Sequence, residues 1–153
     1  MHIVLSAIGK LKKNSPEYEL VNTYLKRTRW SIDIKEYEEK HSLSGETLKN
    51  AEADLLLSGV PEGAKVVVLD EHGDTLSSRE FAGKLRAWQA NGSSTVAFLI
   101  GGADGHGKKA KDRADLTLSF GRMTLPHFLM RVVLAEQIYR AKTILDGHPY
   151  HRD

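Results

Sequence analysis

The chain has 153 residues and no cysteine, which fits one domain over residues 1–153 and excludes disulfide bonds, thiolate nucleophiles and cysteine zinc sites. Its formal net charge of +2 is too small to identify a dedicated nucleic-acid-binding domain by charge alone. Because it has neither an apolar run long enough for a membrane span nor a signal peptide, we expect a soluble, cytoplasmic protein.

Strand and helix patterns alternate through the first part of the chain. Ser15 is followed by Pro16, an arrangement typical of the start of a helix. Ile32 and Ile34 alternate with charged residues, which indicates a half-exposed strand. The elements expected here are a strand at 2–8, a helix at 15–28, a strand around 32–37 and a helix at about 45–57.

Two fully apolar, β-branched runs in the second part indicate strands that are covered on both faces. They are residues 66–69 and 95–100. Ser77, with Glu80 three residues later, predicts a helix start. The remaining expected elements are a loop at 70–76, a helix from 77 to about 91, a short helix at about 107–113, a short strand at 115–118 and a long helix at about 126–145.

This alternation predicts an α/β fold with a mostly parallel sheet and helices on both faces. In such sheets ligands bind beyond the carboxyl ends of the strands. Three segments that follow predicted strands would then form one cleft. They begin at Leu69, at Gly101 and at the loop over residues 119–126.

The last helix is apolar around most of its circumference, whereas a surface helix needs only one apolar stripe. We therefore expect it to pack on its own sheet and on a second copy of the chain, as in a homodimer. Glu136, Arg140 and Thr143 form a narrow polar stripe at helical spacing. By itself, the Glu136 and Arg140 pair is more typical of a solvated helix surface than of a catalytic couple.

Gly101, Gly102 and Gly105 allow the backbone to approach a ligand closely, although a double glycine alone is more typical of an ordinary turn. The loop lacks the G-x-G-x-x-G pattern, so an ordinary dinucleotide-binding fold is unsupported. The tail, residues 147–152, is rich in imidazole, phenol and guanidinium groups and is expected to be ordered. His148 and His151 are an alternative pair of zinc ligands, but they lack a clear third partner.

The glycine loop, the loop over residues 119–127 and the tail, in this order, resemble the SPOUT methyltransferases. The similarity covers the whole chain, and within the class the chain closely resembles the bacterial enzymes that methylate N3 of a pseudouridine in 23S ribosomal RNA. It implies a carboxyl-terminal trefoil knot and the cofactor S-adenosylmethionine, with S-adenosylhomocysteine as product and no metal. The cofactor-binding residues that it implies are Leu69, Gly101, Gly102, Gly121, Arg122, Met123, Thr124, Leu125 and Pro126.

The resemblance also implies a homodimer in which the cofactor of one subunit faces the tail of the other, with helix 69 of the assembled ribosome as target. Methylation of an imide nitrogen requires loss of its proton. Glu136 and His151 are our candidates for handling that proton, and Arg140 and Arg152 for stabilising charge. Arg131, His127 and Tyr150 are candidates for binding RNA, although the arginines alone could equally balance acids, Tyr150 could be a core residue, and His127 could simply be part of the first helical turn.

Three other functions remain as alternatives. The same fold and cofactor could serve a transfer RNA or another uridine, and a basic dimeric protein could bind ribosomes without catalysis. A hydrolase is disfavoured because the chain has no serine elbow, no cysteine and no convincing metal set. His106 departs from the apolar residue that the resemblance leads us to expect, which puts the local conformation of the glycine loop in doubt.

Overall fold

Five parallel strands form one sheet, in the order β2-β1-β4-β3-β5, in the computed structural model, which describes residues 1–152. This arrangement confirms the predicted α/β class with a parallel sheet. The strands are β1 (His2–Ile8), β2 (Ser31–Tyr37), β3 (Lys65–Thr75), β4 (Thr95–Ile100) and β5 (Leu116–Ser119).

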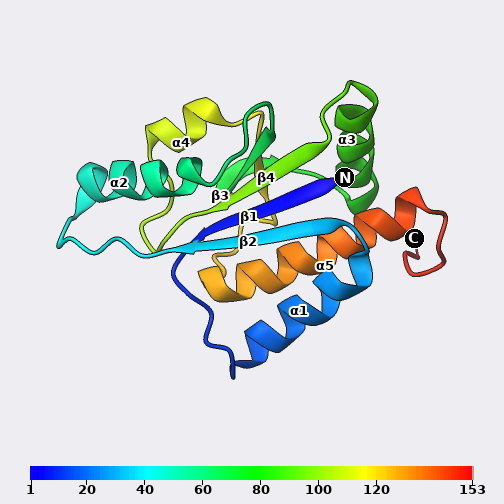
Figure 1. The fold of residues 1–153 in the computed structure, drawn as a ribbon, viewed down its shortest axis with the longest axis horizontal. Coiled ribbons are helices and arrows are strands. Elements are labelled where there is room, and N and C mark those ends of the chain that lie inside the picture. Colours follow the sequence, from blue (N-terminus) through cyan, green and yellow to red (C-terminus); the bar gives the residue numbers. More distant parts are fainter. Residues whose placement is uncertain (153) are drawn as a thin grey trace.

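Helices cover both faces of the sheet (Figure 1). On one face lie α1 (Pro16–Thr28), α3 (Ser78–Ala90) and α5 (His127–Leu145). On the other lie α2 (Gly45–Ser58) and α4 (Lys108–Arg113). The long α5 packs beside both α1 and α3, so it forms the centre of its layer.

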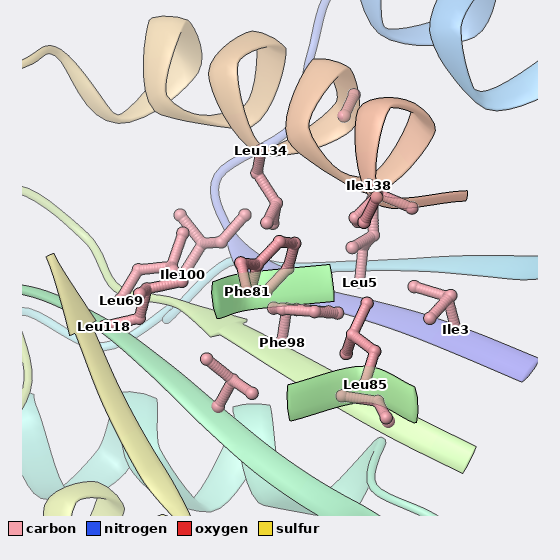
Figure 2. Close-up of a cluster of buried hydrophobic side chains, with 14 of the residues drawn as sticks. Ile3, Leu5, Leu69, Phe81, Leu85, Phe98, Ile100, Leu118, Leu134 and Ile138 are labelled. Atoms are coloured by element: carbon pink, nitrogen blue, oxygen red, sulfur yellow. The ribbon is translucent and has the colours of Figure 1, made fainter. Parts of the chain in front are cut away.

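Alternate residues of the central strands supply the cores of the two layers. Val67 and Leu69 of β3 belong to the cluster under α1, α3 and α5, whereas Val66 and Val68 belong to the cluster under α2 and α4. Figure 2 shows the larger cluster, in which Phe98 of β4 lies among side chains from the helices. A strand buried on both faces reads as a continuous apolar run, which is why these strands were recognisable.

Two helix starts are fixed by the serine caps that the sequence predicts. The Ser15 side chain accepts a hydrogen bond from the amide of Tyr18. Ser77 and Glu80 form a reciprocal capping box at the start of α3. Such caps satisfy amides that have no partner within the helix, and each stabilises it by about 1 kcal/mol.

Strand β3 is longer than predicted, because it continues through the segment assigned to a loop. Leu69 and Asp74 both pair with Leu118 of β5, so the intervening residues of β3 bulge away from the ladder. The pattern of apolar residues stops at Leu69, whereas pairing with β5 resumes beyond the bulge. The bulge places Asp70 and its neighbours at the carboxyl edge of the sheet.

The trefoil knot stays a prediction, although the order of the strands is compatible with it. Within residues 1–152, no helix is both long enough and apolar enough to cross a membrane.

Candidate active site

A cavity of about 340 Å³ opens at the carboxyl ends of β3, β4 and β5, which are neighbours in the sheet. Its walls come from the bulge after Leu69, from the glycine loop over residues 100–106, and from the loop that leads to α5. The first turn of α5 closes one side with His127 and Met130. The cavity therefore lies where a parallel sheet is expected to bind a ligand.

Seven of the nine predicted cofactor residues line this cavity. They are Leu69, Gly101, Gly102, Gly121, Met123, Thr124 and Leu125. Arg122 and Pro126 are exposed and are not among its lining residues. The structure thus brings most of the predicted set into one place, and cofactor binding by these residues stays a prediction.

The glycine loop is held close to two buried side chains. The backbone amide of Gly101 donates a hydrogen bond to Nε2 of His106 across 3.0 Å. A Cβ atom added to Gly102 would lie 2.9 Å from Oε1 of Glu52, closer than non-bonded atoms approach. A side chain at position 102 would therefore have to displace the buried Glu52 carboxylate, a contact that an ordinary turn would not involve.

His106 is buried, and its ring is a neutral hydrogen-bond acceptor. Burial lowers the pKa of His106 to about 4, although the carboxylate of Asp70 acts in the opposite direction. Its side chain, which departs from the expected apolar type, fills the space behind the loop and fixes the amide of Gly101. The local conformation is thus defined by a polar contact that the sequence did not predict.

An ion pair at the cavity wall was missed by sequence reasoning. Oδ2 of Asp70 lies 2.8 Å from Nζ of Lys111, and the Asp70 side chain is 8% exposed. Burial alone would raise the pKa of Asp70, but hydrogen bonds from Lys111 and from the amide of His72 hold it below its ordinary value. The available signal was the position of Asp70, directly after a buried strand at its carboxyl end.

A second group of predicted residues gathers near the carboxyl end of α5, and we call Glu136, Arg140, Tyr150 and His151 the tail cluster. Nε of Arg140 donates to Oε1 of Glu136 at 3.0 Å, and Nη2 donates to the same oxygen at 2.5 Å. Nη1 of Arg140 lies 3.2 Å from Nδ1 of His151, and the Tyr150 hydroxyl donates to Glu136 at 3.0 Å. Burial and the bond to Glu136 raise the pKa of Tyr150 to about 12, so the phenol stays protonated.

The tail folds back on α5 through aromatic contacts, as its composition led us to expect. The Arg140 guanidinium lies 4.8 Å from the centre of the Tyr150 ring. That ring packs against Tyr139, with 4.7 Å between their centres. Thr143, the last residue of the predicted polar stripe, is buried, and its hydroxyl donates to the carbonyl of Arg140.

Arg131 was predicted to bind RNA, a role that stays a prediction, and the structure places its side chain in the interior of this chain. Its side chain is only 4% exposed, and Nη1 donates to Oε1 of Glu36 at 2.6 Å. Nη2 donates to the carbonyls of Ile8 and Gly9 at 2.7 Å each. Burial lowers the pKa of Arg131, and Glu36 opposes that shift. The guanidinium therefore joins α5 to the ends of β1 and β2, and within residues 1–152 its Nε is buried without a hydrogen-bond partner.

The cavity and the tail cluster lie at different positions along α5. Met130 lines the cavity, and Arg140 follows ten residues later, which corresponds to about 15 Å along a helix. His127, a predicted RNA contact, lines the cavity, and burial lowers its pKa. Arg152 is exposed at the end of the described chain. One chain therefore does not bring the predicted catalytic residues to the predicted cofactor site.

The two tail histidines do not form a metal centre with a third ligand. In residues 1–152 there is no group of three or more His, Cys, Asp or Glu side chains arranged to hold a metal ion. Nδ1 of His148 instead accepts a hydrogen bond from the amide of Tyr150 at 3.2 Å. The histidine thus helps to shape the turn of the tail.

Comparison with known proteins gives a consistent result over the full length. Residues 1–151 match the family described as predicted SPOUT methyltransferase. The chain is 55% identical to ribosomal RNA large subunit methyltransferase H of Paramagnetospirillum magneticum and 49% identical to the protein of that name from Rhodospirillum centenum, with 99% of both chains covered in each case. A solved probable methylase family protein from Haemophilus influenzae has a similar fold, with a TM-score of 0.57 at 11% identity over 99% of this chain and 70% of that chain.

Proposed function

Since this chain belongs to the SPOUT methyltransferase family, we propose that it transfers a methyl group from S-adenosylmethionine to N3 of a pseudouridine in 23S ribosomal RNA. The proposed target is helix 69 of the assembled ribosome in the cytoplasm. The observation that carries the proposal is the cavity at three strand ends, in a chain similar over its whole length to proteins named ribosomal RNA large subunit methyltransferase H.

The cavity suits the proposed cofactor in size and in the character of its walls. A volume of about 340 Å³ lies within the usual range for small-molecule sites. Leu69, Leu118 and Leu125 supply apolar surface for an adenosine ring, and Gly101 and Gly102 leave room for close approach of the backbone. When bound, S-adenosylmethionine supplies a methyl group on a positively charged sulfur.

The protein's main tasks in this reaction are to orient the nucleobase and to accept its N3 proton. Both carboxylate oxygens of Glu136 already accept hydrogen bonds, from Arg140, Tyr150 and Gln137. Nδ1 of His151 also contacts Arg140, and we favour His151 as the proton acceptor because histidine is the side chain that most often serves as a general base. Glu136 then holds Arg140, whose positive charge stabilises the anion formed at the base.

The distance between the cavity and the tail cluster supports a composite site. Because about 15 Å of helix separates them, we propose that the tail cluster of one subunit faces the cavity of its partner in a homodimer. Met123 at the cavity is 85% exposed and Leu129 on the first turns of α5 is 42% exposed. Exposed apolar side chains beside a cleft are typical of an interface.

The decisive experiment uses ribosomes from a strain that lacks the modification. The purified protein is incubated with isotopically labelled S-adenosylmethionine, and the labelled nucleoside is mapped by mass spectrometry. We expect one label, on N3 of a pseudouridine in helix 69, and none on free transfer RNA. Label on transfer RNA would overturn the proposed target. Ribosome binding without transfer, and without thermal stabilisation by the cofactor, would favour a non-catalytic binding factor.

A further inference from the structure

We infer that Glu52 and His106 are positioning residues that hold the glycine loop in its binding conformation before the cofactor arrives. The inference rests on the proposed function, because it assigns the loop a role in cofactor binding. It concerns two side chains that neither the resemblance nor the predicted site included. Glu52 does not line the cavity, and His106 contributes to its wall from behind the loop.

Glu52 comes from α2, which packs on the opposite face of the sheet from α5. The residue is 8% exposed, and its carboxylate oxygen Oε1 lies against Gly102, whose backbone amide acts to lower the pKa of Glu52. Its other oxygen, Oε2, is buried and has no hydrogen-bond partner within residues 1–152. A Cβ atom on Gly102 would collide with Oε1, so the loop and the carboxylate are in direct contact.

A buried carboxylate with an unsatisfied oxygen is costly to keep in a fold. Burial raises the pKa of Glu52, and the negative charges of Asp104 and Glu39 act in the same direction. An apolar side chain at this helix position would avoid that cost and would still cover the sheet. The contact with Gly102 is the feature that an apolar side chain would lose.

His106 holds the neighbouring residue in the same way. Its Nε2 accepts a hydrogen bond from the amide of Gly101, so two successive loop residues, Gly101 and Gly102, are both in contact with buried side chains of the protein. The turn is then completed by a hydrogen bond from the amide of Gly105 to the carbonyl of Gly102. The loop is therefore ordered without a ligand, which lowers the entropic cost of binding one.

The first test substitutes Glu52 and measures both loop protection and ligand affinity. Glu52→Gln keeps an acceptor oxygen and the size of the side chain, whereas Glu52→Leu removes the acceptor. Asp54→Asn and Asp54→Leu are matched controls on the same helix, because Asp54 is exposed and pairs with Lys109 instead of the loop. Amide hydrogen exchange of residues 101–105 is measured in the unliganded protein, and calorimetry gives the affinity for S-adenosylhomocysteine.

We expect Glu52→Leu to accelerate exchange in the loop and to weaken S-adenosylhomocysteine binding by at least about tenfold, whereas Glu52→Gln stays within about threefold of the parent. The KM for S-adenosylmethionine should rise in parallel, while kcat and the KM for ribosomes change by less than about threefold. If Glu52 has only a structural role, Glu52→Leu should reduce the amount of folded protein without a selective rise in the KM for S-adenosylmethionine. Unchanged exchange and affinity in Glu52→Leu would overturn the inference.

A second test does not depend on a large apolar replacement. Gly102→Ala should weaken ligand binding by about tenfold in the parent, because the added methyl group meets Glu52, but by less than about threefold when Glu52 is replaced by alanine. If Gly102→Ala weakened ligand binding by the same factor with and without the Glu52 replacement, Glu52 would not act through Gly102. If the parent bound neither cofactor nor product, the proposed function would fail, and the exchange measurement would still decide whether Glu52 orders the loop.

Discussion

The Tyr150 hydroxyl donates to Oε1 of Glu136 across 3.0 Å, which fastens the tail to α5. The same carboxylate oxygen accepts hydrogen bonds from both Nε and Nη2 of Arg140, whose guanidinium lies over the Tyr150 ring. One carboxylate thus organises a phenol and a guanidinium near a chain end that usually frays. The cluster is therefore shaped in a single chain before any partner is added.

Replacing Tyr150 with phenylalanine removes one hydrogen bond and keeps the aromatic packing. We expect the free energy of unfolding to fall by about 1 kcal/mol, since Glu136 retains its bonds to Arg140. Hydrogen exchange should become faster in residues 147–152 and stay unchanged in the sheet. Urea unfolding of Tyr150→Phe beside Tyr18→Phe, the same change in α1, checks the prediction. Equal losses in the two variants would show that the Glu136 contact is not the cause.

Arg131 is predicted to be required for stability and not for RNA affinity. Arg131→Met removes the Arg131 donor to the carbonyls of Ile8 and Gly9 and leaves Oε1 of Glu36 with only the amide of Leu11, so we expect a loss of about 3 kcal/mol in the free energy of unfolding. The exposed Arg27→Met in α1 should change it by less than about 0.5 kcal/mol. At a temperature where both variants are folded, the ribosome affinity of Arg131→Met should match that of the parent. A selective loss of ribosome affinity would instead show that Arg131 binds RNA.

The elements of this fold were predictable because their signals are local. The capping box of Ser77 and Glu80, and the apolar run from Val66 to Leu69, lie within a few residues of the structure that they specify. The extension of β3 beyond Leu69 was not predictable, because it depends on pairing with Leu118, about fifty residues away. Local patterns therefore predict helices and strands, whereas strand register and bulges also depend on the residues of the partner strand.

In the candidate site, too, local sequence patterns identified some features and missed those that depend on distant residues. Glycines and loops after strands identified the cavity, because strand ends meet at one edge of a parallel sheet. The burial of Arg131 was not predictable because its acceptors, Ile8 and Gly9, lie more than a hundred residues away in the chain. Glu52 was missed for a similar reason, since in the sequence it is one more acid on an amphipathic helix. Buried polar contacts over long separations carry little local signal.

His106 should make stability depend on pH. An unfolded histidine titrates near pH 6.5, whereas His106 in the fold, facing Asp70 and Lys111, titrates at about pH 4. The unfolded chain therefore binds more protons between these values, and stability falls as the pH falls through that window. From pH 7 to pH 5 this histidine should remove about 2 kcal/mol from the free energy of unfolding.

His106→Asn keeps a hydrogen-bond acceptor near Gly101 and does not titrate in this range. Urea unfolding gives the free energy of unfolding at pH 7 and at pH 5. Its decrease between these two pH values should be smaller by about 2 kcal/mol in His106→Asn than in the parent. His72→Asn is the control, because His72 is exposed and should leave the drop unchanged. An identical pH dependence in the parent and in His106→Asn would mean that His106 is not held neutral by burial.

A composite site predicts that two inactive variants restore activity together. Gly102→Val distorts the cavity wall, because its side chain would meet the Glu52 carboxylate and displace the glycine loop, and Arg140→Ala disrupts the tail cluster, about 15 Å away on α5. In a mixed dimer one site pairs an intact cavity with an intact tail cluster, and the other site carries both defects. If subunits mix at random, half of the dimers are mixed, and methyl transfer should recover to about a quarter of the parent rate. Transfer to ribosomes is measured after the differently tagged variants are produced together, with each variant alone as control. A mixture no more active than its components would show that the cavity and the tail cluster do not act across subunits.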